Sequence, residues 1–202
     1  MKSTDAKAKP AEKIKELLRI VLRENEACAS RVTGVSLQEV LNRLQRAKRI
    51  FVVGEGRSGL VGRMFAMRLT HAGKEAFVVG ETTTPPIGKG DWMIAISASG
   101  ETPVTCLLAE SVLLNHAKLI AITAKQRSTL SKIAECTLLV PAPSKRNFAN
   151  KRALGVAIKS AQFAGSLFEQ QALLILDSLC LALAEAEHID RATMWKRHAN
   201  LE

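Results

Sequence analysis

The chain has 202 residues, of which 47% are hydrophobic and 24% charged, a composition that predicts one globular domain with a substantial core and excludes a disordered chain. Its 29 basic and 19 acidic side chains give a net charge of +10, which favours anionic partners such as sugar phosphates, nucleotides or nucleic acid. Tyrosine is absent and aromatic residues make up only 4%, so stacking platforms for single strands are not expected and we predict no nucleic-acid partner.

The first 47 residues predict a tail followed by two helices. Residues 1–9 are polar and lysine-rich, so we expect a flexible tail without the apolar stretch of a secretory signal. Between residues 10 and 27 the apolar positions recur at helical spacing, and Ser36 is predicted to cap a second helix. Two amphipathic helices over 10–47 are too few for a separate domain, so we expect them to pack on the sheet or on another subunit.

Strand and helix patterns alternate over residues 49–140. The strands are expected at 50–53, 76–79, 92–96, 119–123 and 137–140, and the helices at 60–72, 103–116 and 128–134. Paired prolines exclude a regular helix from the connection that follows the second strand. The alternation predicts an α/β fold, a three-layer αβα sandwich around a five-stranded parallel sheet of the flavodoxin-like, doubly wound type.

The C-terminal helices are expected over 160–202, so that 10–202 form a single domain. Residues 165–186 are apolar around the whole circumference, which predicts a helix buried between the sheet and a neighbouring subunit. Because Glu169 and Asp177 interrupt this run, it lacks the roughly 20 uninterrupted apolar residues of a membrane span. We therefore expect a soluble, cytoplasmic protein with no membrane partner. Asp190 is predicted to cap a short last helix.

A glycine-rich turn follows the first predicted strand. Gly54, Gly56 and Gly59 enclose Arg57 and Ser58, and a helical pattern comes next. Gly56, Arg57 and Ser58 are candidate ligand residues, although Arg57 in such a turn either contacts a phosphate or is simply exposed. The spacing also satisfies the dinucleotide pattern G-x-G-x-x-G, for which Glu81 would be a late ribose-binding acid.

A hydroxyl-rich turn, residues 97–102, follows the third predicted strand. Thr102 and Pro103 mark a helix start, where unpaired N–H groups and the helix dipole favour an anion. Candidate phosphate-binding residues here are Ser97, Ala98, Ser99, Gly100, Glu101 and Thr102. An ordinary capped turn is the alternative. Because carboxyl ends of neighbouring parallel strands share one crevice, the two turns together predict a phosphate ligand site.

Two titratable residues are candidates for catalysis. Glu169 lies near the start of the apolar helix, where a buried carboxylate serves as a general base or, alternatively, only caps the first turn. His198 lies in a polar tail, where a histidine is either catalytic or simply exposed to solvent.

Other side chains carry weaker signals. Cys28, Cys106, Cys136 and Cys180 are far apart and have no neighbouring histidines at zinc spacing, so they predict reduced thiols and no metal site. The basic segment 145–152 is consistent with a solvated loop or with a rim that attracts a phosphorylated substrate.

The two turns at 54–59 and 97–102 resemble those of the sugar isomerase (SIS) domain family. Four further stretches resemble the 6-phospho-3-hexuloisomerases of that family, namely 65–69, 79–85, 165–170 and 197–201. One departure is visible, because Phe163 and Ala164 stand where those proteins usually have a Pro-Met pair.

The resemblance implies interconversion of D-arabino-hex-3-ulose 6-phosphate and D-fructose 6-phosphate through a cis-enediol, in the ribulose monophosphate pathway of formaldehyde assimilation. It implies a homotetramer that needs no metal or other cofactor and is functionally coupled to a 3-hexulose-6-phosphate synthase. It also implies that Ser58, Ser97, Ser99 and Thr102 hold the phosphate, that Glu169 is the base, and that His198 reaches a neighbour's site.

Two other functions are compatible with the SIS domain. One is a regulator that binds a sugar phosphate without catalysis, although such proteins usually carry a helix-turn-helix domain ahead of the SIS domain. The other is an isomerase of another sugar phosphate. Phosphoheptose isomerase commonly uses zinc, for which this sequence has no ligand spacing, and arabinose 5-phosphate isomerase often has additional C-terminal domains.

Overall fold

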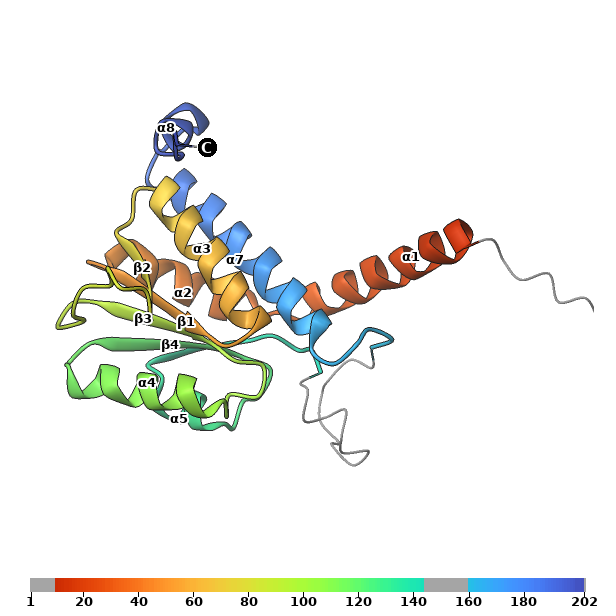
Figure 1. Cartoon of the computed structure of the whole chain (residues 1–202), viewed down its shortest axis with the longest axis horizontal. Helices are drawn as coiled ribbons and strands as arrows, with labels where there is room; N and C mark the ends of the chain where they lie inside the picture. The colour runs from red at the N-terminus through yellow and green to blue at the C-terminus, as the bar shows by residue number, and fades with distance from the viewer. Residues whose placement is uncertain (1–9, 144–159, 202) are drawn as a thin grey trace, which may run out of the picture.

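The computed structural model describes residues 10–143 and 160–201. The predicted tail 1–9 and the basic segment 145–152 lie outside the described residues. Five parallel strands form one sheet in the order β2-β1-β3-β4-β5 (Figure 1). The strands are β1 (Ile50–Gly54), β2 (Ala76–Val78), β3 (Trp92–Ile96), β4 (Lys118–Thr123) and β5 (Cys136–Leu139). This order is the flavodoxin-like one, so the predicted fold class is confirmed.

Helices cover both faces of the sheet (Figure 1). One face carries α2 (Gly34–Arg46), α3 (Arg57–His71) and α7 (Ser166–Ala186), and the other carries α4 (Pro103–Leu114) and α5 (Thr129–Ile133). Two further helices are α1 (Pro10–Ala29), which packs on α7, and the short α8 (Arg191–Lys196). Because the sheet is covered on both faces, every residue of β3 is buried.

One expectation about the helices needs correction. The second helix begins at Gly34 and is capped by Thr33 instead of Ser36, because the Thr33 side chain accepts a hydrogen bond from the Ser36 N–H. The burial of the apolar helix α7 between the sheet and a neighbouring subunit stays a prediction. The helix packs on α1, α2 and α3, but Leu174 and Leu181 are 52% and 59% exposed.

By length and composition alone, α7 is the single helix in the described part of the chain that would be able to cross a membrane. Its place in the fold gives another reason for its apolar character. Leu167, Phe168, Leu176 and Leu183 of α7 are buried in the core cluster that also contains residues of α2, α3 and the sheet. The buried face of α7 is therefore apolar because it belongs to the core.

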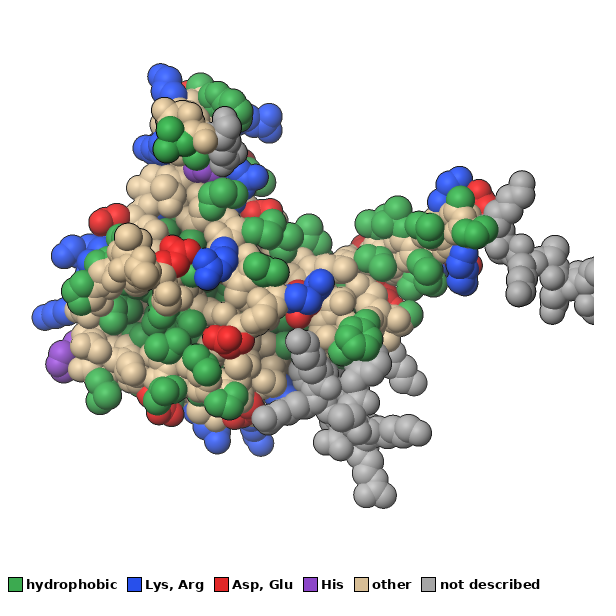
Figure 2. All heavy atoms as spheres, viewed as in Figure 1, with side chains coloured by type: hydrophobic (Ala, Val, Ile, Leu, Met, Phe, Trp, Pro, Cys, Tyr) green, Lys and Arg blue, Asp and Glu red, His purple; other side chains and the backbone are tan. Residues whose placement is uncertain are grey.

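The first helix α1 projects away from the sheet (Figure 1), and Figure 2 shows hydrophobic side chains along it. Four of these side chains, Ile14, Leu17, Leu18 and Leu22, are between 48% and 66% exposed. The apolar stripe that the sequence predicted is therefore present, and within the described residues most of it remains open to solvent.

Candidate active site

The two turns predicted to bind a ligand lie side by side. Strands β1 and β3 are parallel neighbours, and Gly54 at the end of β1 is in register with Ile96 at the end of β3. The chain leaves β1 toward β2 on one side, whereas β3 and β4 lie on the other, so the two turns flank the point where the strand order reverses. Ligands of open α/β sheets bind in the crevice at such a point.

Glycines let the first turn fold tightly under the start of α3. A Cβ added at Gly59 would lie 2.5 Å from the Gly54 carbonyl oxygen, so this close approach excludes any side chain. Gly56, the residue before α3, has a φ of +58°, which L-residues with side chains rarely adopt. The glycines therefore serve backbone geometry and bring the α3 N-terminus to the crevice.

Hydrogen bonds fix the second turn. The Ser97 and Thr102 hydroxyl oxygens are 2.8 Å apart, and the Gly100 N–H donates to Ser97 Oγ at 3.2 Å. The Glu101 N–H donates to Ser99 Oγ at 3.2 Å. The Thr102 hydroxyl thus bonds Ser97 instead of capping α4, and the first turn of α4 keeps N–H groups that suit an anion.

Glu101 lies in the hydroxyl-rich turn and is hydrogen-bonded to the start of α5. Its carboxylate accepts hydrogen bonds from the Thr129 N–H at 2.9 Å and from the Thr129 hydroxyl at 2.6 Å. This ties the hydroxyl-rich turn to the first residue of α5. Gly100 lies close to the same helix, because an added Cβ would be 2.2 Å from Ser128 Oγ. Contacts with the start of α5 therefore hold the turn in place.

The two turns and the start of α7 line one cavity of about 330 Å³, a size that suits a small metabolite. The predicted residues that line it are Gly56, Ser58, Ser97, Ala98, Ser99, Glu101, Thr102 and Glu169. Sequence reasoning missed Glu55, Ile96, Pro103 and Gly165 as lining residues. The first three are direct neighbours of predicted residues, so extending each turn by one residue would have found them, whereas Gly165 precedes Glu169 by one helical turn.

Glu169 is buried, with 5% of its surface exposed, in the first turn of α7. Gly165 before it has a left-handed φ of +91°, and the Glu169 N–H donates to the Gly165 carbonyl oxygen at 3.1 Å. The Glu169 carboxylate forms an ion pair with Arg57, whose guanidinium reaches it from the first turn of α3. The structure thus joins two predicted residues that stand 112 positions apart.

His198 lies elsewhere in this chain. Its ring stacks on the His71 ring, with centroids 5.0 Å apart, and on the Trp195 ring at 5.3 Å. His71 ends α3, whereas Arg57, the partner of Glu169, begins it. Figure 1 shows α8 and the C-terminus at the far end of α7. At 1.5 Å per residue the 21 residues of α7 span about 30 Å, so His198 does not reach the cavity of its own chain.

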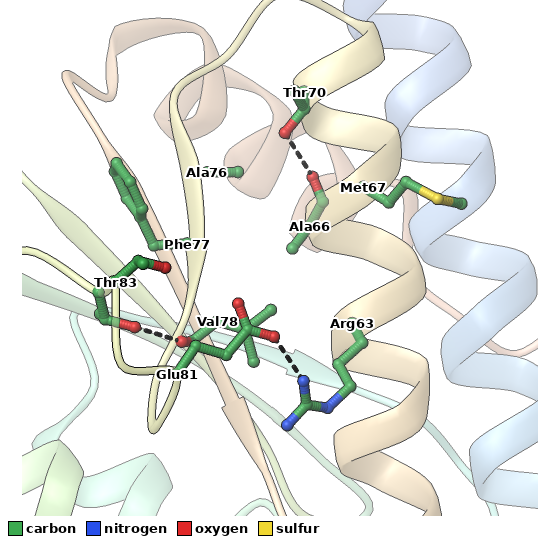
Figure 3. Close-up of a pocket in the computed structure, with 10 residues that line it drawn as sticks. Arg63, Ala66, Met67, Thr70, Ala76, Phe77, Val78, Glu81 and Thr83 are labelled. Carbon is green, nitrogen blue, oxygen red and sulfur yellow. Dashed lines mark hydrogen bonds and ion pairs between the residues drawn. The ribbon is translucent and has the colours of Figure 1, made fainter. Parts of the chain in front are cut away.

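A second cavity, drawn in Figure 3, lies between α3 and the edge strand β2. Arg63 and Glu81 form an ion pair at 2.5 Å in it, and the Thr84 hydroxyl donates to the Val78 carbonyl oxygen at 2.7 Å. Glu81, the acid that a dinucleotide site would require, therefore belongs to a different cavity. Within residues 10–143 and 160–201, no three His, Cys, Asp or Glu side chains are grouped as metal ligands would be.

Comparisons with known proteins agree on the family. Residues 43–170 match the family model of the SIS domain. The 3-hexulose-6-phosphate isomerase of Bacillus subtilis (strain 168) is 35% identical over 190 residues, which cover 94% of this chain and 100% of that protein. The 3-hexulose-6-phosphate isomerase of Mycobacterium gastri is 35% identical over 185 residues, which cover 92% of this chain and 89% of that protein.

Solved structures give the same result. The crystal structure of a hypothetical protein from Methanococcus jannaschii, described as inferring a function of 3-hexulose-6-phosphate isomerase, matches with a TM-score of 0.75. The two chains are 31% identical, and the match covers 93% of this chain and 99% of the other.

Proposed function

The chain belongs to the SIS domain family, and from that membership we propose that it is a 3-hexulose-6-phosphate isomerase, which converts D-arabino-hex-3-ulose 6-phosphate into D-fructose 6-phosphate. The observation that carries the proposal is the single cavity in which a hydroxyl-rich turn, a helix N-terminus and the buried Glu169 meet. Such a cavity combines an anion site for the phosphate with a base for the carbon chemistry.

The phosphate is assigned to the two turns. Ser58, Ser97, Ser99 and Thr102 all line the cavity, and their hydroxyls donate hydrogen bonds to phosphate oxygens. The N-terminus of α4 adds its free N–H groups and the positive end of its dipole. Holding the phosphate fixes the far end of the sugar, so its C2 and C3 atoms are presented in one orientation.

Glu169 is assigned as the carbon base. Its carboxylate removes the proton from C2 while the C3 carbonyl oxygen gains a proton, which gives the cis-enediol. The hydroxyl on C2 then loses its proton and becomes the carbonyl, and Glu169 returns its proton to C3. A second group must move protons to and from the oxygens on C2 and C3. We assign this role to the imidazole of His198 from a neighbouring chain, because His198 does not reach the cavity of its own chain.

The assembly and cellular setting are further parts of the proposal. Residues 10–202 form one SIS domain, and four copies form a homotetramer in the cytoplasm, functionally coupled to a 3-hexulose-6-phosphate synthase. The exposed apolar side chains on α1 and α7 support association, because a stripe of this kind is normally covered by another surface.

A coupled assay tests the proposed function. Purified protein is given formaldehyde, ribulose 5-phosphate and a hexulose-phosphate synthase, and fructose 6-phosphate is followed with and without a chelator. We expect product that depends on this protein and is unaffected by chelation. If no fructose 6-phosphate forms while a sugar phosphate still raises the melting temperature, the chain is a sugar-phosphate sensor or an isomerase of another sugar.

A further inference from the structure

The ion pair between Arg57 and Glu169 conflicts with the task assigned to Glu169. Glu169 Oε2 accepts a hydrogen bond from Arg57 Nε, so the lone pair used in that bond is not open to a proton on carbon. To act through this oxygen, the base has to lose Arg57 as its partner.

The charges around the cavity show what else attracts Arg57. Three glutamates line the cavity, Glu55, Glu101 and Glu169, and among the described residues no lysine or arginine lines it. A phosphate dianion that enters this surrounding needs a positive partner close by. Arg57 is placed to supply it, because its chain neighbours Gly56 and Ser58 both line the same cavity.

The two partners differ in their freedom to move. The Arg57 side chain is 60% exposed, whereas the Glu169 side chain is 6% exposed and belongs to a helix buried in the core. Arginine has a long side chain that changes rotamer easily, and its planar donors match phosphate as well as carboxylate. If the ion pair opens, Arg57 is therefore the residue that moves.

We propose that Arg57 exchanges partners when the substrate binds. Without substrate it pairs with Glu169, and the arriving phosphate dianion draws it to the phosphate oxygens and leaves the carboxylate free to act on C2. The exchange rests on the proposed isomerase function. The phosphate then activates the base in addition to anchoring the substrate. A sugar without phosphate leaves Glu169 paired with Arg57 and is turned over slowly.

A structure with bound inorganic phosphate tests the exchange independently of any activity. Crystals are soaked in inorganic phosphate, and the position of the Arg57 guanidinium is compared with that in phosphate-free crystals. We expect phosphate at Ser97, Ser99 and Thr102, with Arg57 bonded to it and separated from Glu169. The proposal is overturned if phosphate occupies the turn while Arg57 remains on Glu169, or if phosphate is absent from the turn.

Kinetics with an unphosphorylated 3-hexulose test the consequence. For the unaltered protein, added phosphite dianion should raise turnover of this sugar by about tenfold or more, because it draws Arg57 away from the base. For Arg57→Ala we expect the phosphite-free turnover to rise above that of the unaltered protein, because the base is no longer paired, and the activation by phosphite to disappear. Arg63→Ala on the outer part of α3 is the matched control and should behave like the unaltered protein.

The opposite results are informative as well. If Arg57→Ala lowers turnover of the unphosphorylated sugar, Arg57 orients the base permanently and does not release it. A phosphite activation that persists in Arg57→Ala also overturns the exchange. If the coupled assay with the phosphorylated substrate fails, the isomerase function is wrong, but the soaked crystals still decide whether Arg57 changes partner.

Discussion

The two ends of the parallel strands carry different kinds of structure. We call the side where the strands end the carboxyl edge and the side where they begin the amino edge. At the carboxyl edge, two turns built around glycines and hydroxyls enclose a cavity with the buried Glu169. At the amino edge, the partly buried Arg49 forms an ion pair with the buried Asp91 next to the starts of β1 and β3. The His198 ring there stacks against the end of α3. The first edge has open donors that suit a ligand, whereas Arg49 and Asp91 at the second satisfy each other. The comparison teaches that substitutions at the carboxyl edge should change activity and those in the pair of Arg49 and Asp91 should change stability, whereas His198 acts at a neighbouring chain's cavity.

The largest expected effect follows from Glu169→Gln. Removing the carboxylate removes the base, so kcat should fall by about 10³-fold or more while inorganic phosphate still binds. The rate at which fructose 6-phosphate forms in the coupled assay measures this. Glu185→Gln, an exposed glutamate on the same helix, is the control and should keep normal kcat. A Glu169→Gln protein with more than about a tenth of normal turnover would remove Glu169 from the role of base.

At the amino edge, Asp91→Asn should cost about 3 kcal/mol of unfolding free energy and leave kcat almost unchanged. Asp91 is 1% exposed and receives hydrogen bonds from Arg49 Nη2 at 2.6 Å and from the Gly88 N–H at 2.8 Å. Denaturant titration measures the loss. A large fall in kcat with little change in stability would contradict the division between the two edges.

The same pair predicts a dependence on pH. Burial acts to raise the pKa of Asp91, but the hydrogen bonds from Arg49 and Gly88 outweigh it, so the pKa lies below its usual range. The stabilisation is therefore complete above the pKa of an unfolded aspartate, about 3.9, and is lost as pH falls through the lower folded value. The stability difference between the unaltered protein and Asp91→Asn should shrink on acidification. A difference that stays constant down to pH 2 would argue against the ion pair as its source.

A smaller effect is expected from Gly100→Ala in the hydroxyl-rich turn. The φ of +62° and the closeness of Ser128 Oγ mean that a Cβ shifts the turn, at a cost of about 2 kcal/mol. Substrate KM should rise because Ser99 and Thr102 move with the turn. Gly34→Ala is the control, since an added Cβ there meets no described atom within 4 Å. An unchanged KM for Gly100→Ala would place the phosphate outside this turn.

The smallest effect concerns the cysteines. Burial raises the pKa of Cys28 and Cys136 to about 11 and that of Cys180 to about 12, and all four cysteines are buried. Native protein at pH 8 should therefore react slowly with a thiol reagent, whereas denatured protein exposes four thiols. Rapid modification with loss of activity would show that a cysteine near the candidate active site is accessible to the reagent in the native protein. Because the thiols are favoured in the folded state, stability should fall as pH rises above about 9.

Much of the carboxyl edge was predictable from the sequence because its signals are local. The glycines at 54, 56 and 59 and the hydroxyls at 97, 99 and 102 each follow a short apolar strand, and parallel strands end at one edge. The helix boundaries were less predictable. Both Thr33 and Ser36 are good caps, and the preference for Thr33 depends on which backbone N–H each hydroxyl meets.

Contacts between distant parts of the chain were not predictable. The ion pair of Arg57 with Glu169 depends on how α7 packs in the fold. The hydrogen bonds that Glu101 accepts from Thr129 likewise depend on how α5 packs on the sheet. The exposed Leu174 and Leu181 show the same limit. A helix that is apolar all round predicts burial, but whether its own chain or another copy covers each side is a property of the assembly.

Mixing two inactive variants tests most directly whether the two ends of α7 meet between chains. Glu169→Gln and His198→Ala proteins are purified separately, each is assayed alone, and they are then denatured and refolded together. We expect each to be nearly inactive and the mixture to recover about a quarter of normal activity, because some mixed sites pair an intact Glu169 with an intact His198. If mixed oligomers form without recovered activity, or if His198→Ala alone is fully active, the two residues do not share a site.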